Sequence, residues 1–277
     1  MSSPKLLKTK VLLEGLKFPE SPRWHDGKLW FSDMDLKKVM TVDLNGTKEV
    51  ILEMEDSPSG LGWLPDGRLL IVSMDEERLL RLDSDGVKIA ADLKSLATFK
   101  CNDMVVDKQG RAYVGNFGFD YNKERFKPAE IILVKPDGTV QVVADNMAFP
   151  NGTVITPDDK TLIVAETFGS KLTAFDILDD GLLKNRRIWA TIEGLLPDGI
   201  CLDADGGIWV ASPGRGKVFR VLEGGEITHE VQVSTQAFAC MLGGHDRRTL
   251  FVATSTNERS TGQIEIVEVE IPGVGLP

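Results

Sequence analysis

The sequence is poor in the residues that build disulfide frameworks and zinc clusters. Its 277 residues include only three cysteines, Cys101, Cys201 and Cys240, and only three histidines. An odd number of cysteines with no CxxC spacing argues against a disulfide-stapled scaffold, and reduced thiols are typical of a cytoplasmic protein. We therefore predict a cytoplasmic chain whose cysteines fill the core.

Long apolar runs and an excess of positive charge are also missing. No segment reaches the length of a transmembrane helix, and the first residues lack the apolar stretch and cleavage site of a secretory signal. Acidic residues outnumber basic residues by 42 to 32, which gives a net charge of -10. Because this charge repels phosphate backbones and anionic lipids, we expect neither a nucleic-acid partner nor a membrane partner.

Several catalytic motifs are absent as well. The chain has no GxSxG nucleophile elbow, no P-loop and no GxGxxG dinucleotide fingerprint. With so few histidines, a histidine-based lactonase dyad also has little support.

What the sequence does contain is one unit repeated six times. The unit has a polar or small turn, a short apolar strand, a turn with Asp or Gly, and a stronger apolar strand. The copies begin at residues 18, 57, 101, 149, 196 and, more weakly, 238. Short strands with period-two patterning between such turns are hairpin signals. We predict an all-β fold: a single six-bladed β-propeller domain over 1–277, with four antiparallel strands in each blade.

The segment 8–16 (KTKVLLEGL) precedes the first unit and is interpreted as a lone strand. We expect it to close the ring by adding the outer strand of the last blade, which removes an open sheet edge. Since a closed ring needs no partner to cover an edge, we expect a monomer.

One position of the repeat carries an oxygen-bearing side chain in five of the six copies. The repeats align there on Glu20, Ser59, Asn102, Asn151, Asp198 and Ala239, at intervals of 39, 43, 49, 47 and 41 residues. Inner strands of a propeller converge on its channel, so these side chains should face one another. Alone, each is also ordinary turn chemistry, in which the side chain bonds nearby backbone. Together, two carboxylates and two amides in a partly dry channel favour a bound cation.

The predicted donor set consists of oxygen atoms only. Such a set suits hard cations better than metals that prefer thiolate ligands. We predict one divalent metal ion, with Ca²⁺ as the expected ion and Mg²⁺, Mn²⁺, Zn²⁺ and Fe²⁺ as alternatives.

The repeated segments resemble the senescence marker protein (regucalcin) and gluconolactonase family of six-bladed propellers. The resemblance covers nearly the whole chain and is most specific in EGLKFPESPRW, CNDMVVDKQGRAYVGN, FPNGTVITPDDKTLIVAET and LPDGICLDADGGIWVA. It implies that Glu20, Asn151 and Asp198 are metal ligands. It also implies that Asn102 lies beside the metal and contacts the substrate, and that Asp198 is the general base.

The chain departs from the family pattern in three places. Lys100 stands where sugar lactonases commonly carry an arginine, and we expect it to orient the substrate together with Asn102. Met104 stands where a glycine is usual. The segment 115–126 (GNFGFDYNKERF) is longer and more aromatic, and we expect it to form a rim or lid of the pocket. These departures leave the metal-binding residues in place and open the way to a more apolar lactone or ester.

The resemblance implies a metal-dependent lactonase, a carboxylic ester hydrolase similar to gluconolactonase. Two alternatives remain open. A related family of organophosphate fluorohydrolases arranges one Glu, two Asn and one Asp around calcium in a similar way, which favours an organophosphate or aryl-ester hydrolase at the same site. The other is a calcium-binding regulatory propeller without turnover, although such a scaffold needs no converging polar ring.

Overall fold

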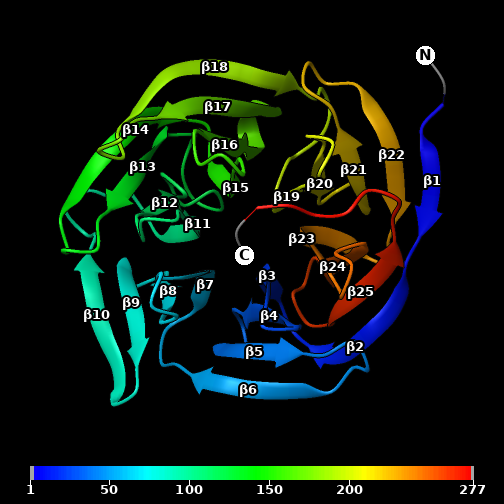
Figure 1. Ribbon diagram of the computed structural model, residues 1–277, viewed down its shortest axis with the longest axis horizontal. Helices are drawn as coiled ribbons and strands as arrows, with labels where there is room; N and C mark the ends of the chain where they lie inside the picture. The colour runs from blue at the N-terminus through cyan, green and yellow to red at the C-terminus, as the bar shows by residue number, and fades with distance from the viewer. Residues whose placement is uncertain (1–2, 276–277) are drawn as a thin grey trace.

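The computed structural model describes residues 3–275, which form six β-sheets arranged as the blades of a ring (Figure 1). Within each blade the four strands that run from the channel outward are antiparallel, and the first strand of the repeat lies next to the central channel. The predicted six-bladed β-propeller is therefore confirmed. Among the described residues, no helix is long and apolar enough to cross a membrane.

The blades are numbered here in chain order, and each is described from the channel outward. Blades 1 to 3 consist of β3 (Pro19–His25), β4 (Lys28–Asp33), β5 (Lys38–Val42) and β6 (Lys48–Glu53); β7 (Pro58–Trp63), β8 (Leu69–Ser73), β9 (Arg78–Asp83) and β10 (Gly86–Asp92); and β11 (Cys101–Val106), β12 (Ala112–Asn116), β13 (Ala129–Val134) and β14 (Val140–Met147). Blades 4 to 6 consist of β15 (Pro150–Ile155), β16 (Thr161–Glu166), β17 (Lys171–Ile177) and β18 (Leu183–Thr191); β19 (Ile200–Leu202), β20 (Ile208–Ser212), β21 (Lys217–Val221) and β22 (Ile227–Gln232); and β23 (Gln236–Gly243), β24 (Thr249–Ser255) and β25 (Gly262–Glu268). A short 3-10 helix, η1 (Thr167–Gly169), follows β16.

The N-terminal segment closes the ring. Strand β2 (Lys10–Leu16) pairs antiparallel with β25 and supplies the outer strand of blade 6, which confirms the expected closure by segment 8–16. A strand that the sequence did not indicate, β1 (Lys5–Lys8), pairs parallel with β22 of blade 5. Residues 5–16 therefore join two blades, and only the outer edge of blade 5 gains a fifth strand.

The position of a strand within its blade explains its composition. Strand β8 (LLIVS) is buried along its whole length because neighbouring blades cover both of its faces. Outer strands such as β6 (KEVILE) are mostly exposed and mix charged with apolar residues. Between β3 and β4, Asp26 and Gly27 both have positive φ, of 49° and 75°, which suits the two-residue turn of a right-twisted hairpin.

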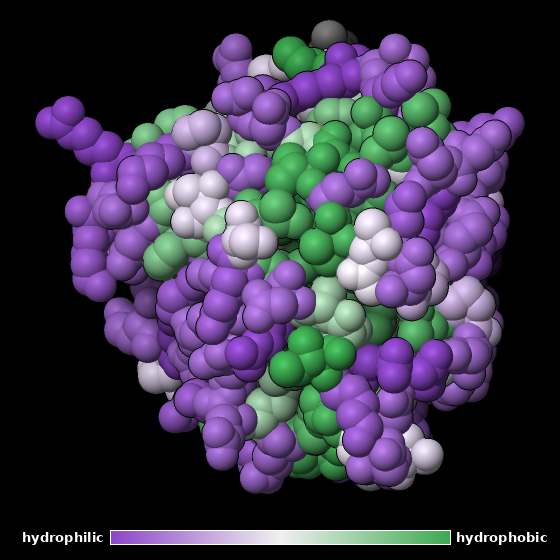
Figure 2. Space-filling model, turned by 90° about the vertical axis from the view of Figure 1, so that its left-hand side faces the viewer, coloured by the Kyte–Doolittle hydropathy of each residue, from purple (hydrophilic) through white to green (hydrophobic). Residues whose placement is uncertain are grey.

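The hydrophobic core lies between neighbouring blades. Met104 and Val106 of β11, for example, pack with Leu70 and Val72 of β8. All three cysteines are buried, free and located in inner strands, as expected of core residues. Apolar side chains also reach the outer surface: seen from the side on which β10 and β14 lie, they form a band between hydrophilic residues (Figure 2).

The two ends of the central channel differ. After β25 the chain turns toward the centre of the ring (Figure 1), where the backbone N–H of Val274 donates a hydrogen bond to the carbonyl of Leu202. The cavity at this end, lined partly by Val274 and Gly275, has a volume of only about 30 Å³. At the opposite end of the inner strands lies a cavity of about 530 Å³. Of these two ends of the channel, only the one with the cavity of about 530 Å³ has room for a molecule the size of a lactone.

Candidate active site

The predicted site residues meet at the larger cavity. Glu20, Asn102 and Asn151 are each the second residue of an inner strand, and Asp198 lies two residues before β19. All four side chains line the cavity of about 530 Å³, and each residue is at most 8% exposed. The fifth oxygen-bearing residue, Ser59, is fully buried behind this cavity wall.

A recurring irregularity of the inner strands places these side chains. The pairing register shifts around the site position in blades 1 to 4, between Glu20/Arg23, Pro58/Leu61, Cys101/Met104 and Pro150/Thr153. An extra residue in one strand bends it and redirects a side chain, which is why such bulges recur beside active sites. In blade 1 the bulge includes Ser21, a non-glycine residue with a φ of 48°. This strained residue directly follows Glu20 and helps to fix its direction.

Gly152, which follows Asn151, lets the inner strands of blades 4 and 5 approach one another. A Cβ atom on Gly152 would lie 2.5 Å from the nitrogen of Ile200 and 2.6 Å from the carbonyl oxygen of Asp198. The N–H of Gly152 donates to that same oxygen at 3.2 Å. The backbone carrying Asn151 is thereby held against the backbone carrying Asp198.

Replacing Gly152 with alanine is expected to weaken both the fold and the site. The added methyl group would meet backbone atoms of blade 5, so the strands must separate, at a cost of about 1–3 kcal/mol in the free energy of unfolding. Metal affinity, measured by calorimetry, should fall in parallel. Gly206→Ala is the control for the steric effect, because nothing lies within 4 Å of the added atom there; its cost comes only from the positive φ of Gly206, which Gly152 does not have. Unchanged metal affinity in Gly152→Ala would show that this close approach does not shape the site.

A chain of hydrogen bonds orients the two amides. The Ser59 hydroxyl donates to Oδ1 of Asn102 at 3.2 Å, and Nδ2 of Asn102 donates to Oδ1 of Asn151 at 3.2 Å. Nδ2 of Asn151 donates to the hydroxyl of Thr167 at 3.3 Å, which in turn donates to the carbonyl of Pro197 at 2.8 Å. Because an amide oxygen has two lone pairs, Oδ1 of Asn151 keeps one acceptor position free.

The surroundings of the two carboxyl groups at the site disfavour their ionised forms. Burial, together with the charge of Asp103, raises the pKa of Glu20 to about 7, although the N–H of Ser21 acts in the opposite direction. Burial also raises the pKa of Asp198 well above its ordinary value, and Glu20 and Asp103 add to this effect. The amide of Asn151 and the N–H of Gly199 oppose the rise for Asp198. A positive charge between the two carboxylates would stabilise their ionised forms.

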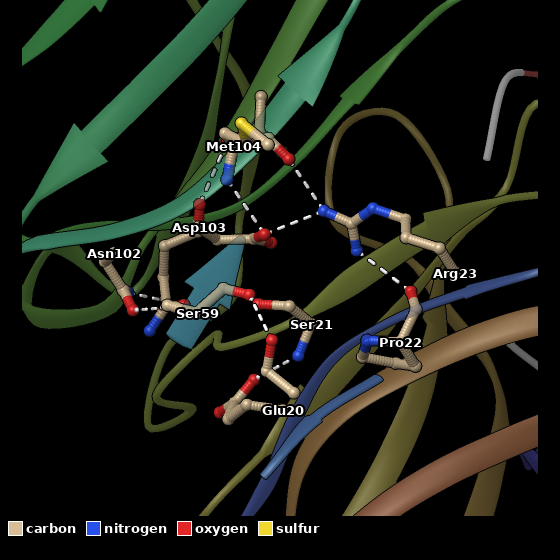
Figure 3. Close-up of polar contacts among 11 residues, drawn as sticks. Glu20, Ser21, Pro22, Arg23, Ser59, Asn102, Asp103 and Met104 are labelled. Carbon is tan, nitrogen blue, oxygen red and sulfur yellow. Dashed lines mark hydrogen bonds and ion pairs between the residues drawn. The ribbon is translucent and has the colours of Figure 1, made fainter. Parts of the chain in front are cut away.

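A buried ion pair lies next to the site (Figure 3). Nη2 of Arg23 in β3 donates to Oδ1 of Asp103 in β11 at 2.7 Å and to the carbonyl of Met104 at 2.7 Å. Nη1 of Arg23 donates to the carbonyl of Pro22 at 2.9 Å. The pair joins blade 1 to blade 3, beside the residues that carry Glu20 and Asn102.

The donor set fits a cation held by oxygen atoms. Glu20 and Asp198 supply carboxylates whose ionised forms lack sufficient compensation, and Asn151 supplies an oriented amide oxygen. Within residues 3–275, no group of three or more His, Cys, Asp or Glu side chains is arranged to hold a metal. Any ion here therefore depends on the amides as well as the carboxylates, a mixture that suits Ca²⁺.

The rim of the cavity carries charges in pairs. Lys100, predicted to bind substrate, lies there with its ammonium group bonded to Asp75. Arg259, from the turn after β24, bonds Asp35 at 2.9 Å and stacks over Phe18 at 3.8 Å from the ring centroid. The segment 115–126 contributes aromatic residues to the same rim, in agreement with the expected location.

Three parts of the site were not predicted from the sequence: the Arg23–Asp103 pair, Thr167 and Arg259. The Arg23–Asp103 pair could have been suspected from the sequence, because charged residues inside strands that are otherwise apolar are rarely buried without a partner. Thr167 and Arg259 belong to connections whose course the repeat pattern does not describe.

Comparison with known proteins gives a consistent result. Residues 18–256 match the family described as the SMP-30/gluconolactonase/LRE-like region. The lactonase drp35 of Staphylococcus haemolyticus is 31% identical over 206 residues, which are 69% of this chain and 59% of that protein. The 6-deoxy-6-sulfogluconolactonase of Pseudomonas putida is 23% identical over 274 residues, 93% of each chain. In fold, the calcium-binding protein regucalcin from Agrobacterium tumefaciens matches with a TM-score of 0.83 at 22% identity, over 99% of each chain.

Proposed function

The chain belongs to the SMP-30/gluconolactonase/LRE-like family, and we propose that it opens a lactone ring with the help of one divalent metal ion. Glu20, Asn151 and Asp198 would hold the ion, with Ca²⁺ as the expected metal. The observation that carries this proposal is the meeting of two buried carboxyl groups of raised pKa with an oriented amide oxygen in one cavity. The lactonases among its relatives support the choice of substrate class.

A bound cation would polarise the ester carbonyl and offset negative charge that develops on its oxygen. The reaction adds water to the carbonyl carbon, breaks the bond to the ring oxygen and yields a hydroxy acid. Asp198 is the proposed general base: it takes a proton from the attacking water and returns it to the departing ring oxygen.

Asn102 and Lys100 are the proposed substrate-binding residues. One N–H of Asn102 is occupied by Asn151, so its second N–H can donate to an oxygen of the substrate. Lys100, held at the rim by Asp75, is placed to contact substituents of the lactone ring.

The proposal predicts that catalysis depends on added metal. After a chelator has removed bound metal, the protein should hydrolyse D-gluconolactone and D-xylonolactone no faster than the spontaneous reaction, as followed by proton release. Titration with Ca²⁺, Mg²⁺, Mn²⁺, Zn²⁺ or Fe²⁺ should restore the rate, and the order of the ions would identify the preferred metal. Binding of metal without release from any lactone would overturn the lactonase proposal and direct attention to aryl esters and organophosphates. Failure to bind any of these ions would overturn the metal site itself.

A further inference from the structure

A group of aromatic residues extends the cavity beyond the site just described. Phe119, Tyr121, Phe126 and Phe168, here called the aromatic shelf, line a second cavity of about 370 Å³. Tyr121 and Phe168 also line the cavity that contains Glu20 and Asp198. The two cavities are therefore adjacent, and a molecule bound beside Glu20 and Asp198 can extend over the shelf.

The shelf presents apolar surface on a buried support. Phe126, Tyr121 and Phe168 are 54%, 47% and 45% exposed, whereas Phe119 is only 5% exposed. The ring of Phe119 lies 5.6 Å from that of Phe126 and 5.8 Å from that of Phe168. Phe149, also largely buried, contacts Phe168 at 4.9 Å. Three exposed rings that rest on two buried ones in this way are typical of a ligand-binding groove.

The charges around the cavity argue for a neutral ligand. Among the described lining residues, each lysine or arginine has an acidic partner: Lys100 pairs with Asp75, Lys123 with Asp120 at 3.1 Å, and Arg259 with Asp35 at 2.9 Å. A cation already paired attracts a second anion only weakly. The rim therefore does not select for a phosphate, sulfonate or carboxylate on the substrate.

We propose that the aromatic shelf binds an alkyl chain carried on the lactone ring, so that the preferred substrates are neutral alkyl-substituted lactones. This inference rests on the proposed lactonase function. The ring would lie in the polar cavity with its carbonyl near Asp198, and the chain would pass Phe168 and Tyr121 to reach Phe126. Burial of the chain would add binding without any new hydrogen bond.

Chain length provides the test. For lactones carrying chains from methyl to octyl, kcat/KM at saturating metal should rise about threefold to fourfold per methylene until the shelf is filled. Phe126→Ser and Phe168→Ser should each flatten this rise. The matched control is Ile188→Ser, since Ile188 is 63% exposed on β18 and belongs to neither cavity. No rise with chain length in the unmodified protein, or the same rise in all variants, would overturn the proposal.

A second measurement separates this inference from the lactonase proposal. Cyclopentanones with the same alkyl chains replace the ring oxygen by a methylene and cannot be hydrolysed, so calorimetry reports binding alone. Affinity that grows with chain length and declines in Phe126→Ser would support the shelf even if no lactone were hydrolysed. If lactones are hydrolysed but the affinity for the ketones does not depend on chain length, the lactonase proposal holds and the proposed role of the aromatic shelf is overturned.

Discussion

Replacing Asp198 with asparagine is expected to lower kcat for lactone hydrolysis by about 10²–10⁴-fold at saturating metal, the usual contribution of a general base. Asparagine matches aspartate in size and keeps one side-chain oxygen, but it cannot accept the proton of the attacking water. The backbone of residue 198 should stay in place, because its N–H donates to Ala211 and its carbonyl accepts from Gly152.

Two measurements separate the roles of Asp198 as ligand and as base. Calorimetric titration of the metal gives the loss of affinity, and the rate at saturating metal gives the loss of catalysis. Asp205→Asn is the control, since Asp205 is an exposed carboxylate three residues beyond β19. A variant that binds metal weakly but turns over normally once saturated would show that Asp198 is a ligand only, and another group would have to serve as base.

The fold could be predicted because each blade of a propeller consists of hairpins that short stretches of sequence specify. Each blade repeats the same hairpins, and each hairpin has its own alternation and turn residues, so the six units were visible one at a time. Strand β1 could not be predicted in this way, because it belongs to no hairpin. Lys5–Lys8 contains only four residues, mostly exposed, and its partner β22 lies more than 200 residues away, as the pairing of Lys5 with His229 shows.

The residues of the candidate site could be predicted because the repeat maps equivalent positions onto one ring. Glu20, Asn102 and Asn151 occupy the same place in their strands, and the structure brings them to one cavity with Asp198. Their roles as ligands, base and substrate-binding residues remain predictions. The repeat could not reveal contacts between different positions of different blades, such as the bond from Arg23 to Asp103, because these depend on side-chain length and on the shape of the channel.

That bond is the basis of the second large effect. In the metal-free protein, Arg23→Met is expected to lower the free energy of unfolding by about 3–5 kcal/mol, as is typical when one partner of a buried ion pair is removed. Both residues are only 6% exposed, so water cannot replace the guanidinium beside Asp103. The remaining carboxylate would then stand uncompensated near Glu20 and Asp198, whose pKa values its charge already raises.

Denaturant unfolding in the presence of a chelator measures this loss in the free energy of unfolding. Two further variants show whether it comes from charge. Lys28→Met breaks an exposed ion pair with Glu49 and should cost less than about 1 kcal/mol. The double variant Arg23→Met/Asp103→Asn removes both charges but retains an acceptor for the N–H of Met104, which Asp103 binds at 2.8 Å. It should recover much of the lost stability, because the uncompensated charge is gone. If the double variant is as unstable as Arg23→Met alone, the stabilisation comes from the bonds of Arg23 to the carbonyls of Pro22 and Met104 and not from charge.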